Sequence, residues 1–142
     1  MAIQTVGVVG CGLMGSGIAQ ISAQAGLKVI VREVDDKAVA AGRKKIEGFL
    51  GKAVEKGKMT QEEMNRVTSH ITYTTQVKDL APCDLVVEAI IENLKAKQDL
   101  FRELDGLCAP HAIFSSNTSS LAVGDMAAST SAARRSRFVG LH

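Results

Sequence analysis

Residues 5–15, TVGVVGCGLMG, contain a short β-branched run that passes directly into the glycine pattern G-x-G-x-x-G at Gly10, Gly12 and Gly15. The β-branched run predicts a buried strand, and the small and apolar residues from Leu13 to Ala25 predict a helix after it. Gly10 permits a tight turn, Gly12 leaves room for a pyrophosphate to approach the backbone, and Gly15 lets the helix pack closely on the sheet. The stretch therefore predicts the first half of a βαβ unit that holds phosphate groups.

A second predicted strand, Lys28 to Glu33, ends in an acidic residue roughly 20 positions after the glycine pattern. A carboxylate at Glu33 accepts hydrogen bonds from an adenosine ribose and repels a 2′-phosphate, so the pattern predicts NAD rather than NADP. The phosphates would lie over the helix N-terminus, where Leu13 and Met14 offer backbone N–H groups. Arg32 could instead hold a 2′-phosphate. Because adjacent strand residues point to opposite faces, we interpret Arg32 as a solvated residue at the strand end.

Strand and helix patterns alternate along the rest of the chain. We expect a helical hairpin, Lys37 to Lys56 and Thr60 to about Val67, after the second strand. Further strands are expected at 71–74, 84–90, 112–115 and 138–141, and further helices at about 94–107 and 121–128. The small, polar stretch from Ser129 to Ser136 is expected to be a surface loop. The alternation predicts one α/β domain over residues 1–142, a Rossmann-type, doubly wound and mainly parallel sheet.

The composition excludes several classes of protein. With 46% hydrophobic and 23% charged residues, the 142-residue chain can bury a core and is not disordered. A net charge of +2 gives no basis for nucleic-acid binding. No apolar run approaches the roughly 20 residues that span a membrane, and no signal peptide is evident, so we expect a cytoplasmic protein. Cys11, Cys83 and Cys108 form no C-x-x-C pair, which indicates free thiols and no metal site.

Four segments carry a resemblance to a known family: GCGLMGSGIAQ at 10–20, DLVVEAIIE at 84–92, SNTSSL at 116–121 and GLH at 140–142. Together they resemble the 3-hydroxyacyl-CoA dehydrogenases, including the short-chain 3-hydroxybutyryl-CoA members. The resemblance implies the NAD-binding part of an oxidoreductase of fatty-acid β-oxidation or butanoate metabolism. Such an enzyme interconverts (3S)-3-hydroxyacyl-CoA and 3-oxoacyl-CoA by hydride transfer.

The resemblance also implies roles for individual residues. His142 matches the general base that takes the proton from the 3-hydroxyl, a role that suits imidazole near neutral pH. Ser119 matches a serine that hydrogen-bonds near the reacting carbonyl and the nicotinamide, although Ser119 or Ser120 could instead cap a helix. Glu92 and Lys97 match positions that contact the cofactor; they could equally be surface charges around a helix start.

The long helix after the second strand holds the CoA nucleotide in the resembling family. Lys45, Lys52 and Lys56 are spaced by seven and four residues and share one helix face, which suits a phosphorylated ligand. Lys56 matches a CoA-contacting lysine, and Lys52 belongs to the same basic stripe. A merely solvated face is the alternative, and Phe49 replaces a neighbouring serine of the family.

In the resembling family a glutamate that orients the histidine and an all-helical domain follow the position of His142, where this sequence stops. The resemblance therefore implies a longer protein that dimerises through the helical domain, and we expect the 142-residue chain alone to bind NAD but to be almost inactive. Two competing functions stay open. A sugar-acid, gulonate-type dehydrogenase would not need the basic stripe, and a non-catalytic, crystallin-like NAD-binding protein would not turn over substrate.

Overall fold

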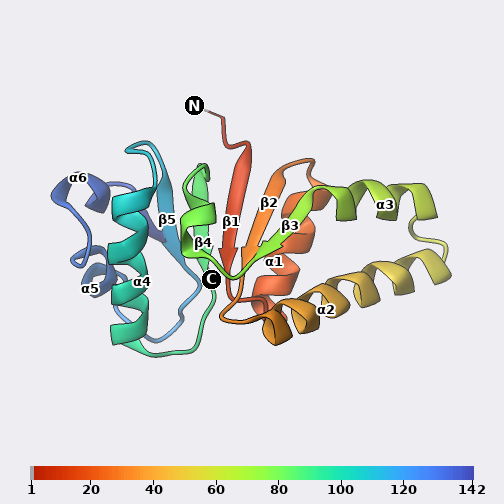
Figure 1. Cartoon of the computed structure of the whole chain (residues 1–142), viewed down its shortest axis with the longest axis horizontal. Coiled ribbons are helices and arrows are strands. Elements are labelled where there is room, and N and C mark those ends of the chain that lie inside the picture. The colour runs from red at the N-terminus through yellow and green to blue at the C-terminus, as the bar shows by residue number, and fades with distance from the viewer. Residues whose placement is uncertain (1) are drawn as a thin grey trace.

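Six short strands form one sheet in the computed structural model, which describes residues 2–142. They are β1 (Thr5–Val9), β2 (Lys28–Arg32), β3 (Ile71–Thr74), β4 (Leu85–Glu88), β5 (Ile113–Ser116) and β6 (Phe138–Gly140). Every neighbouring pair is parallel, and the spatial order is β3-β2-β1-β4-β5-β6 (Figure 1). The chain winds outward from β1 in one direction and then from β4 in the other, which confirms the predicted doubly wound α/β fold.

Helices cover both faces of this sheet (Figure 1). On one face lie α1 (Leu13–Gln24), α2 (Asp36–Glu55) and α3 (Gln61–Ser69). On the other lie the 3-10 turn η1 (Val77–Leu80), α4 (Leu94–Leu107), α5 (Val123–Ala127) and α6 (Ala132–Arg135). The helices α2 and α3 contact each other and form the hairpin that was expected after the second strand.

The central strand β1 has hydrophobic side chains buried on both faces. Val6 and Val8 lie in the core under α1 and α2, whereas Val9 lies in the core under α4. The second core also holds three phenylalanines, Phe101, Phe114 and Phe138, whose ring centroids are 4.6 to 6.4 Å apart. Burial of one such side chain contributes about 1.5–3 kcal/mol, so these two cores hold the sheet between its helices.

Local capping residues set where the hairpin helices begin. The Asp35 carboxylate accepts a hydrogen bond from Ala38 N at 2.8 Å, so α2 begins at Asp36. Thr60 and Glu63 form the predicted capping box, with reciprocal bonds of 3.1 and 2.9 Å. These caps satisfy N–H groups that have no partner within the helix.

The segment from Ser129 to Ser136, predicted to be a surface loop, contains the short helix α6. Its Arg134 side chain is only 4% exposed and lies over the Phe114 ring at 4.5 Å. Most of the segment is exposed, as predicted, but it is not simply a loop. The four residues of α6 carry no helical periodicity, and arginine is rarely buried, so neither the helix nor the burial of Arg134 was predicted. The 3-10 turn η1 was not predicted. The helix that was expected over residues 121–128 begins later, since α5 starts at Val123 rather than Leu121.

Candidate functional site

The glycine loop between β1 and α1 has the geometry that its sequence pattern predicts. Gly10 has a φ of +93°, and a β-carbon there would lie 2.6 Å from the Ala89 carbonyl oxygen. A β-carbon on Gly15 would collide with the Gly10 carbonyl group. At Gly12, by contrast, no atom of the described residues, apart from Gly12 and its chain neighbours, lies within 4 Å of the position that a β-carbon would take. Gly10 and Gly15 thus permit close packing, while Gly12 leaves the backbone open to a ligand.

The N-terminus of α1 lies directly beside this open space. The helix has no side-chain cap, and its first helical hydrogen bond runs from Ser16 N to the Gly12 oxygen at 3.0 Å. The N–H groups of Leu13 and Met14 therefore lie ahead of the helical hydrogen-bond ladder and at the positive end of the helix dipole. Both residues line a cavity of about 270 Å³. The arrangement suits an anionic group such as a pyrophosphate.

Glu33 follows β2 at the same edge of the sheet. Its Oε1 atom accepts a hydrogen bond from Cys11 N at 2.9 Å, and no partner for Oε2 occurs within residues 2–142. The side chain lines a cavity of about 690 Å³, a volume typical of small-molecule sites. The carboxylate is thus tied to the glycine loop through one oxygen, while the other is available to a ribose hydroxyl.

Arg32 differs from its prediction as a free, solvated residue. It is half-buried, its Nε donates to the Thr75 carbonyl oxygen at 3.2 Å, and it lines the same cavity as Glu33. Strand alternation does not separate Arg32 from Glu33, because β2 ends at Arg32 and Glu33 no longer follows the pleat of the strand. Both residues therefore line one cavity.

The two cavities adjoin along the carboxyl ends of β1 and β4. Both are lined by Gly12, Ala89 and Ile90. The larger continues toward Glu33 and the smaller toward Lys97. Ligands of open parallel sheets bind where the strand order reverses, which in this sheet is between β1 and β4. An extended ligand with a central diphosphate over Gly12 fits both halves of this site.

A buried ion-pair cluster lies under the smaller cavity. The Lys97 ammonium is 1% exposed and contacts Glu88 Oε2 at 2.6 Å and Glu92 Oε1 at 2.9 Å. Glu88 is completely buried and accepts a further hydrogen bond from Ser116 Oγ at 2.6 Å. The alternative interpretation of Lys97 as a surface charge is therefore wrong.

Glu92 connects this cluster to the loop after β5. Its Oε2 atom accepts hydrogen bonds from Thr118 Oγ1 at 2.6 Å and Ser120 Oγ at 2.9 Å. The hydroxyl of Thr118 and then the ammonium of Lys97 favour the ionised carboxylate and lower the pKa of Glu92 to about 2. Although its side chain is 48% exposed, Glu92 is thus a fixed anion at the edge of the cavity.

Ser119 lies between the two hydroxyl residues that Glu92 holds. It is exposed, and its hydroxyl makes no hydrogen bond within the described residues 2–142. The helix-cap alternative for Ser119 or Ser120 is wrong: α5 begins after Ala122 without a side-chain cap, and Thr118 Oγ1 accepts from Leu121 N at 3.0 Å. The Ser119 hydroxyl is therefore free to contact a ligand.

His142 follows β6 at the same sheet edge. Leu141 N donates to the Ser116 oxygen at 3.0 Å, which aligns the end of β6 with the start of the Ser119 loop. The imidazole is exposed. The structure therefore brings His142 and Ser119 to the edge that also holds the glycine loop, Glu33, Glu92 and Lys97.

Within residues 2–142, none of the predicted CoA lysines lines either cavity. Lys45, Lys52 and Lys56 are all exposed, and none forms an ion pair in the part of the chain that the structure describes. Figure 1 shows that the far end of α2 projects away from the sheet, with Lys52 in its last turn and Lys56 just beyond Glu55. The stripe is thus a set of exposed cations along α2 and at its end, without an ion-pair partner among the described residues.

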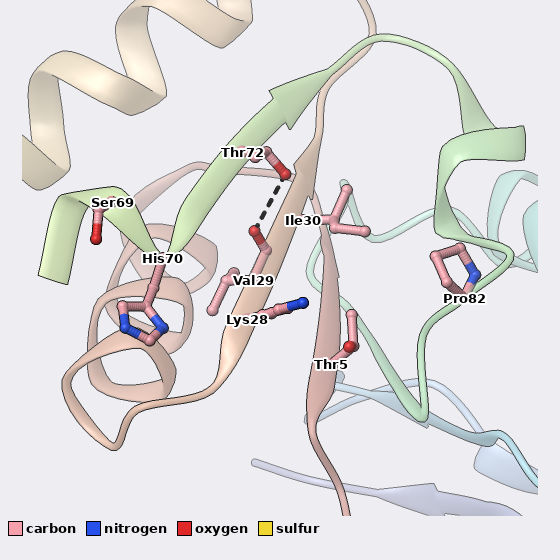
Figure 2. A pocket seen from close by; sticks show the side chains of 8 residues that line it. All are labelled: Thr5, Lys28, Val29, Ile30, Ser69, His70, Thr72 and Pro82. Carbon is pink, nitrogen blue, oxygen red and sulfur yellow. Dashed lines mark hydrogen bonds between the residues drawn. The ribbon is translucent and has the colours of Figure 1, made fainter. Parts of the chain in front are cut away.

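A separate cavity of about 510 Å³ lies at the opposite, amino-terminal edge of the sheet (Figure 2). Thr5 and Lys28 line it from the first residues of β1 and β2, and His70 lines it just before β3. None of the predicted site residues does so. Because parallel sheets bind their ligands at the carboxyl edge, we do not assign this cavity to the cofactor.

Three residues of the cluster were not predicted from the sequence: Glu88, Ser116 and Thr118. Glu88 ends an otherwise apolar strand, LVVE, and this position was a signal, because a carboxylate in a buried strand requires a partner. Ser116 and Thr118 carried no comparable signal, since short hydroxyl residues are common at strand ends and in turns.

Within residues 2–142, no helix combines the length and apolar character needed to cross a bilayer. Likewise, no three His, Cys, Asp or Glu side chains in the span are grouped to hold a metal ion.

Comparisons with known proteins agree with this geometry. A family model described as "3-hydroxyacyl-CoA dehydrogenase, NAD binding domain" matches residues 5–142. The chain is 44% identical over 142 residues to a 3-hydroxybutyryl-CoA dehydrogenase of Mycobacterium tuberculosis. This match covers 99% of this chain and 49% of the relative. It is 41% identical over 146 residues to the mitochondrial hydroxyacyl-coenzyme A dehydrogenase of Sus scrofa, covering 99% of this chain and 46% of that protein.

A solved structure supports the same relationship. The crystal structure of M. tuberculosis FadB2 superposes with a TM-score of 0.96 at 44% identity, and the match covers 100% of this chain and 50% of that one. The chain thus spans about half the length of the curated relatives it matches.

Proposed function

The chain belongs to the 3-hydroxyacyl-CoA dehydrogenase family as its NAD-binding domain, and we propose that the protein interconverts (3S)-3-hydroxyacyl-CoA and 3-oxoacyl-CoA in fatty-acid metabolism. One observation carries the proposal: the open space over Gly12 lies between Glu33 on one side and the Glu92–Lys97 pair on the other. An extended dinucleotide needs an anchor at each end and free backbone at its diphosphate.

The residues at the carboxyl edge fit NAD. Glu33 would accept hydrogen bonds from the adenosine ribose, and the N–H groups of Leu13 and Met14 would hold the diphosphate. Glu92 and Lys97 would hold the second ribose, since both line the smaller cavity. When bound, NAD accepts or supplies the hydride.

Two residues of this chain would act on the substrate. We infer that His142 takes the proton from the 3-hydroxyl during oxidation and returns it during reduction. We infer that the Ser119 hydroxyl donates to the same oxygen when it is a carbonyl, because a hydroxyl can both donate and accept. The exposure of both side chains at one sheet edge supports these roles.

The basic stripe on α2 supports an acyl-CoA substrate. Lys45, Lys52 and Lys56 are exposed, and the structure gives them no ion-pair partner within residues 2–142, so they are available to phosphates. We expect 3′-phospho-ADP to bind weakly and to dissociate as salt is raised. A triple alanine variant at these positions should weaken the binding, whereas Lys28, Arg66 and Lys78 changed together should not. Equal binding of 3′-phospho-ADP by both triple variants would show that the basic stripe is only a solvated face.

Cofactor preference tests the role of Glu33. We expect the chain to bind NADH at least tenfold more tightly than NADPH, a difference of about 1.4 kcal/mol. Glu33→Ala should narrow this gap, because the carboxylate no longer repels the 2′-phosphate. Fluorescence titration measures both affinities, with Glu62→Ala on α3 as the control. Equal affinities in the unchanged chain would remove Glu33 from the site.

Turnover tests the reaction itself. Because we expect the 142-residue chain alone to be almost inactive, the assay uses the whole protein. Its NADH oxidation by acetoacetyl-CoA should exceed oxidation by keto-sugar acids, and Ser119→Ala should lower the rate. Activity on sugar acids alone would point to the gulonate-type alternative. Tight NADH binding by the whole protein without turnover of acyl-CoA or sugar-acid substrates would favour the non-catalytic, crystallin-like alternative. Homodimer formation and a cytoplasmic location stay predictions; sedimentation and cell fractionation measure them.

A further inference from the structure

Of the three charged residues of the ion-pair cluster, Glu88, Glu92 and Lys97, only Glu88 lines neither cavity within residues 2–142. Its side chain is 0% exposed at the carboxyl end of β4. The carboxylate accepts three short hydrogen bonds: from Lys97 Nζ at 2.6 Å, from Ser116 Oγ at 2.6 Å and from Ile90 N at 2.7 Å. Glu88 therefore cannot touch a ligand, yet its partners come from three different segments of the site.

A buried ion pair of this kind is weak evidence for a stabilising role. The cost of removing two charges from water often equals or exceeds their attraction, and apolar residues of similar size can be as stable. Neighbouring positions of the same sheet, such as Val86 and Val87, are filled with valine. The charge at Glu88 thus requires an explanation other than core packing.

The contacts of Glu88 lead toward the Ser119 loop by two routes. Through Lys97 it fixes Glu92, whose other oxygen holds Thr118 and Ser120 at 2.6 and 2.9 Å. Glu88 also fixes the Ser116 Oγ atom, which donates to it and accepts a hydrogen bond from Thr118 N at 3.3 Å. Both residues that flank Ser119 are thus held by groups that Glu88 positions.

The adenosine half of the site meets these contacts at one point only. Glu33 is held by Cys11 N, whereas the Gly10 turn packs against the peptide between Ala89 and Ile90, and Ile90 N donates to Glu88. Neither Glu33 nor Gly10 hydrogen-bonds to Glu88 or Lys97 within residues 2–142. A change at Glu88 that keeps an acceptor for Ile90 N should therefore act on one half of the dinucleotide and spare the other.

We propose that Glu88 is a positioning residue for the nicotinamide half of the site: it holds Lys97 and, through it, Glu92 and the Ser119 loop. The inference rests on the proposed binding of NAD along this edge. Its physical basis is that a buried ammonium shared by two carboxylates has one arrangement, whereas an ammonium with a single partner can turn.

Glu88→Gln in the 142-residue chain tests this proposal, because glutamine keeps the shape and removes the charge. We expect the affinity for NADH to fall about tenfold, while the affinity for AMP, which occupies only the adenosine half, changes less than twofold. Fluorescence measures NADH, and calorimetry measures AMP. Glu62→Gln on α3, exposed and remote from both cavities, should change neither.

A second variant protects the test against misfolding. Ser116→Ala removes one donor to Glu88 but leaves the charges of Glu88, Glu92 and Lys97 in place. It should weaken NADH binding about threefold, with AMP binding again unchanged. An equal loss of both ligands in either folded variant would overturn the proposal in favour of a merely structural role. Unchanged NADH affinity in Glu88→Gln would overturn it as well.

The unchanged chain separates this proposal from the proposed function. If it binds NADH no more tightly than AMP, the dinucleotide site itself fails, and the inference on Glu88 fails with it. If NADH binds more tightly and only the Glu88 variants behave contrary to expectation, the site stands and the positioning role alone falls.

Discussion

Two buried cations lie at opposite edges of the same sheet, and their surroundings differ. Arg134, at the amino edge, is 4% exposed and donates to Asp105 and to the carbonyl oxygens of Cys108 and Ala109. Lys97, at the carboxyl edge, is 1% exposed and pairs with two carboxylates. The planar guanidinium suits the fixed backbone oxygens of the turn between α4 and β5, whereas the ammonium suits side chains that line a cavity.

This difference shows how to interpret buried charge. The partners of Arg134 are mostly backbone atoms, and Arg134 lines neither cavity of the proposed site. Lys97 and Glu92 line the cavity at the strand ends themselves. Burial of a cation alone therefore does not identify a functional site. A buried cation indicates such a site when its partners line a cavity, as Glu92 does beside Lys97. We therefore expect changes at the amino edge to alter stability and changes at the carboxyl edge to alter ligand affinity.

Arg134→Ala should have the largest effect on stability. The change leaves Asp105 without its cation and the Cys108 and Ala112 carbonyl groups without a donor. Removing one partner of a buried pair costs about 3–5 kcal/mol. Urea denaturation measures the loss, and Arg135→Ala, an exposed neighbour, should change it by less than about 0.5 kcal/mol. A changed ratio of NADH to AMP affinity in folded Arg134→Ala would contradict the distinction between the two edges.

Asp84→Ala should have the next largest effect, again at the amino edge. The carboxylate accepts from Gln4 N at 2.9 Å, Thr5 N at 3.0 Å and the His111 ring at 2.8 Å, which lowers the pKa of Asp84. Without it, the start of β1 loses its acceptors, at a cost of about 1–3 kcal/mol. Thermal unfolding should show a smaller loss for Asp84→Asn, which keeps one acceptor. NADH affinity should stay constant in both.

Thr118→Val tests the carboxyl edge with a change of similar shape. The hydroxyl donates to Glu92 and accepts from Leu121 N, so its loss should cost about 1 kcal/mol of stability and weaken NADH severalfold. Thr130→Val is the matched control: it is 6% exposed, and its hydroxyl donates to Ala127 O at 2.6 Å. Equal ligand affinities in the two variants would contradict the distinction between the edges.

Acid should have the smallest effect. The pKa of Glu92 lies near 2, below its ordinary 4.5, so its contribution to stability is complete above pH 4.5 and is lost as pH falls toward 2. Because the side chain is 48% exposed, solvent screening should keep this contribution under about 1 kcal/mol. Carboxyl NMR titration measures the pKa directly. In Glu92→Gln the loss of stability on acidification should be smaller. An unchanged dependence of stability on pH would show that Glu92 does not contribute to it.

Most of the fold could be predicted because its signals are local. Alternation, helical periodicity and glycines marked β1, α1, the hairpin and α4, and caps such as the Thr60–Glu63 box placed their starts within about a residue. The sites at Gly10, Gly12 and Glu33 were predictable for the same reason, since turn geometry and strand ends follow from short-range pattern.

The rest depended on contacts between distant residues. The partners of Arg134 are more than 20 positions away, so neither its burial nor α6 had a local signal. Glu88 and Ser116 are 28 positions apart, and the parallel register of β4 and β5 alone makes them neighbours. Arg32 was misjudged because its strand ends one residue earlier than expected.

The three buried thiols lie at both edges of the sheet and can report on the opening of each edge. Burial raises the pKa values of Cys11, Cys83 and Cys108 to about 11, 12 and 11. Alkylating reagents attack thiolates, so each cysteine reacts only when its surroundings open. Cys11 lies in the glycine loop at one edge, while Cys83 and Cys108 flank β4 and α4 at the other. The rate of alkylation at each site therefore times the opening of each edge separately, in the native chain and without an attached label.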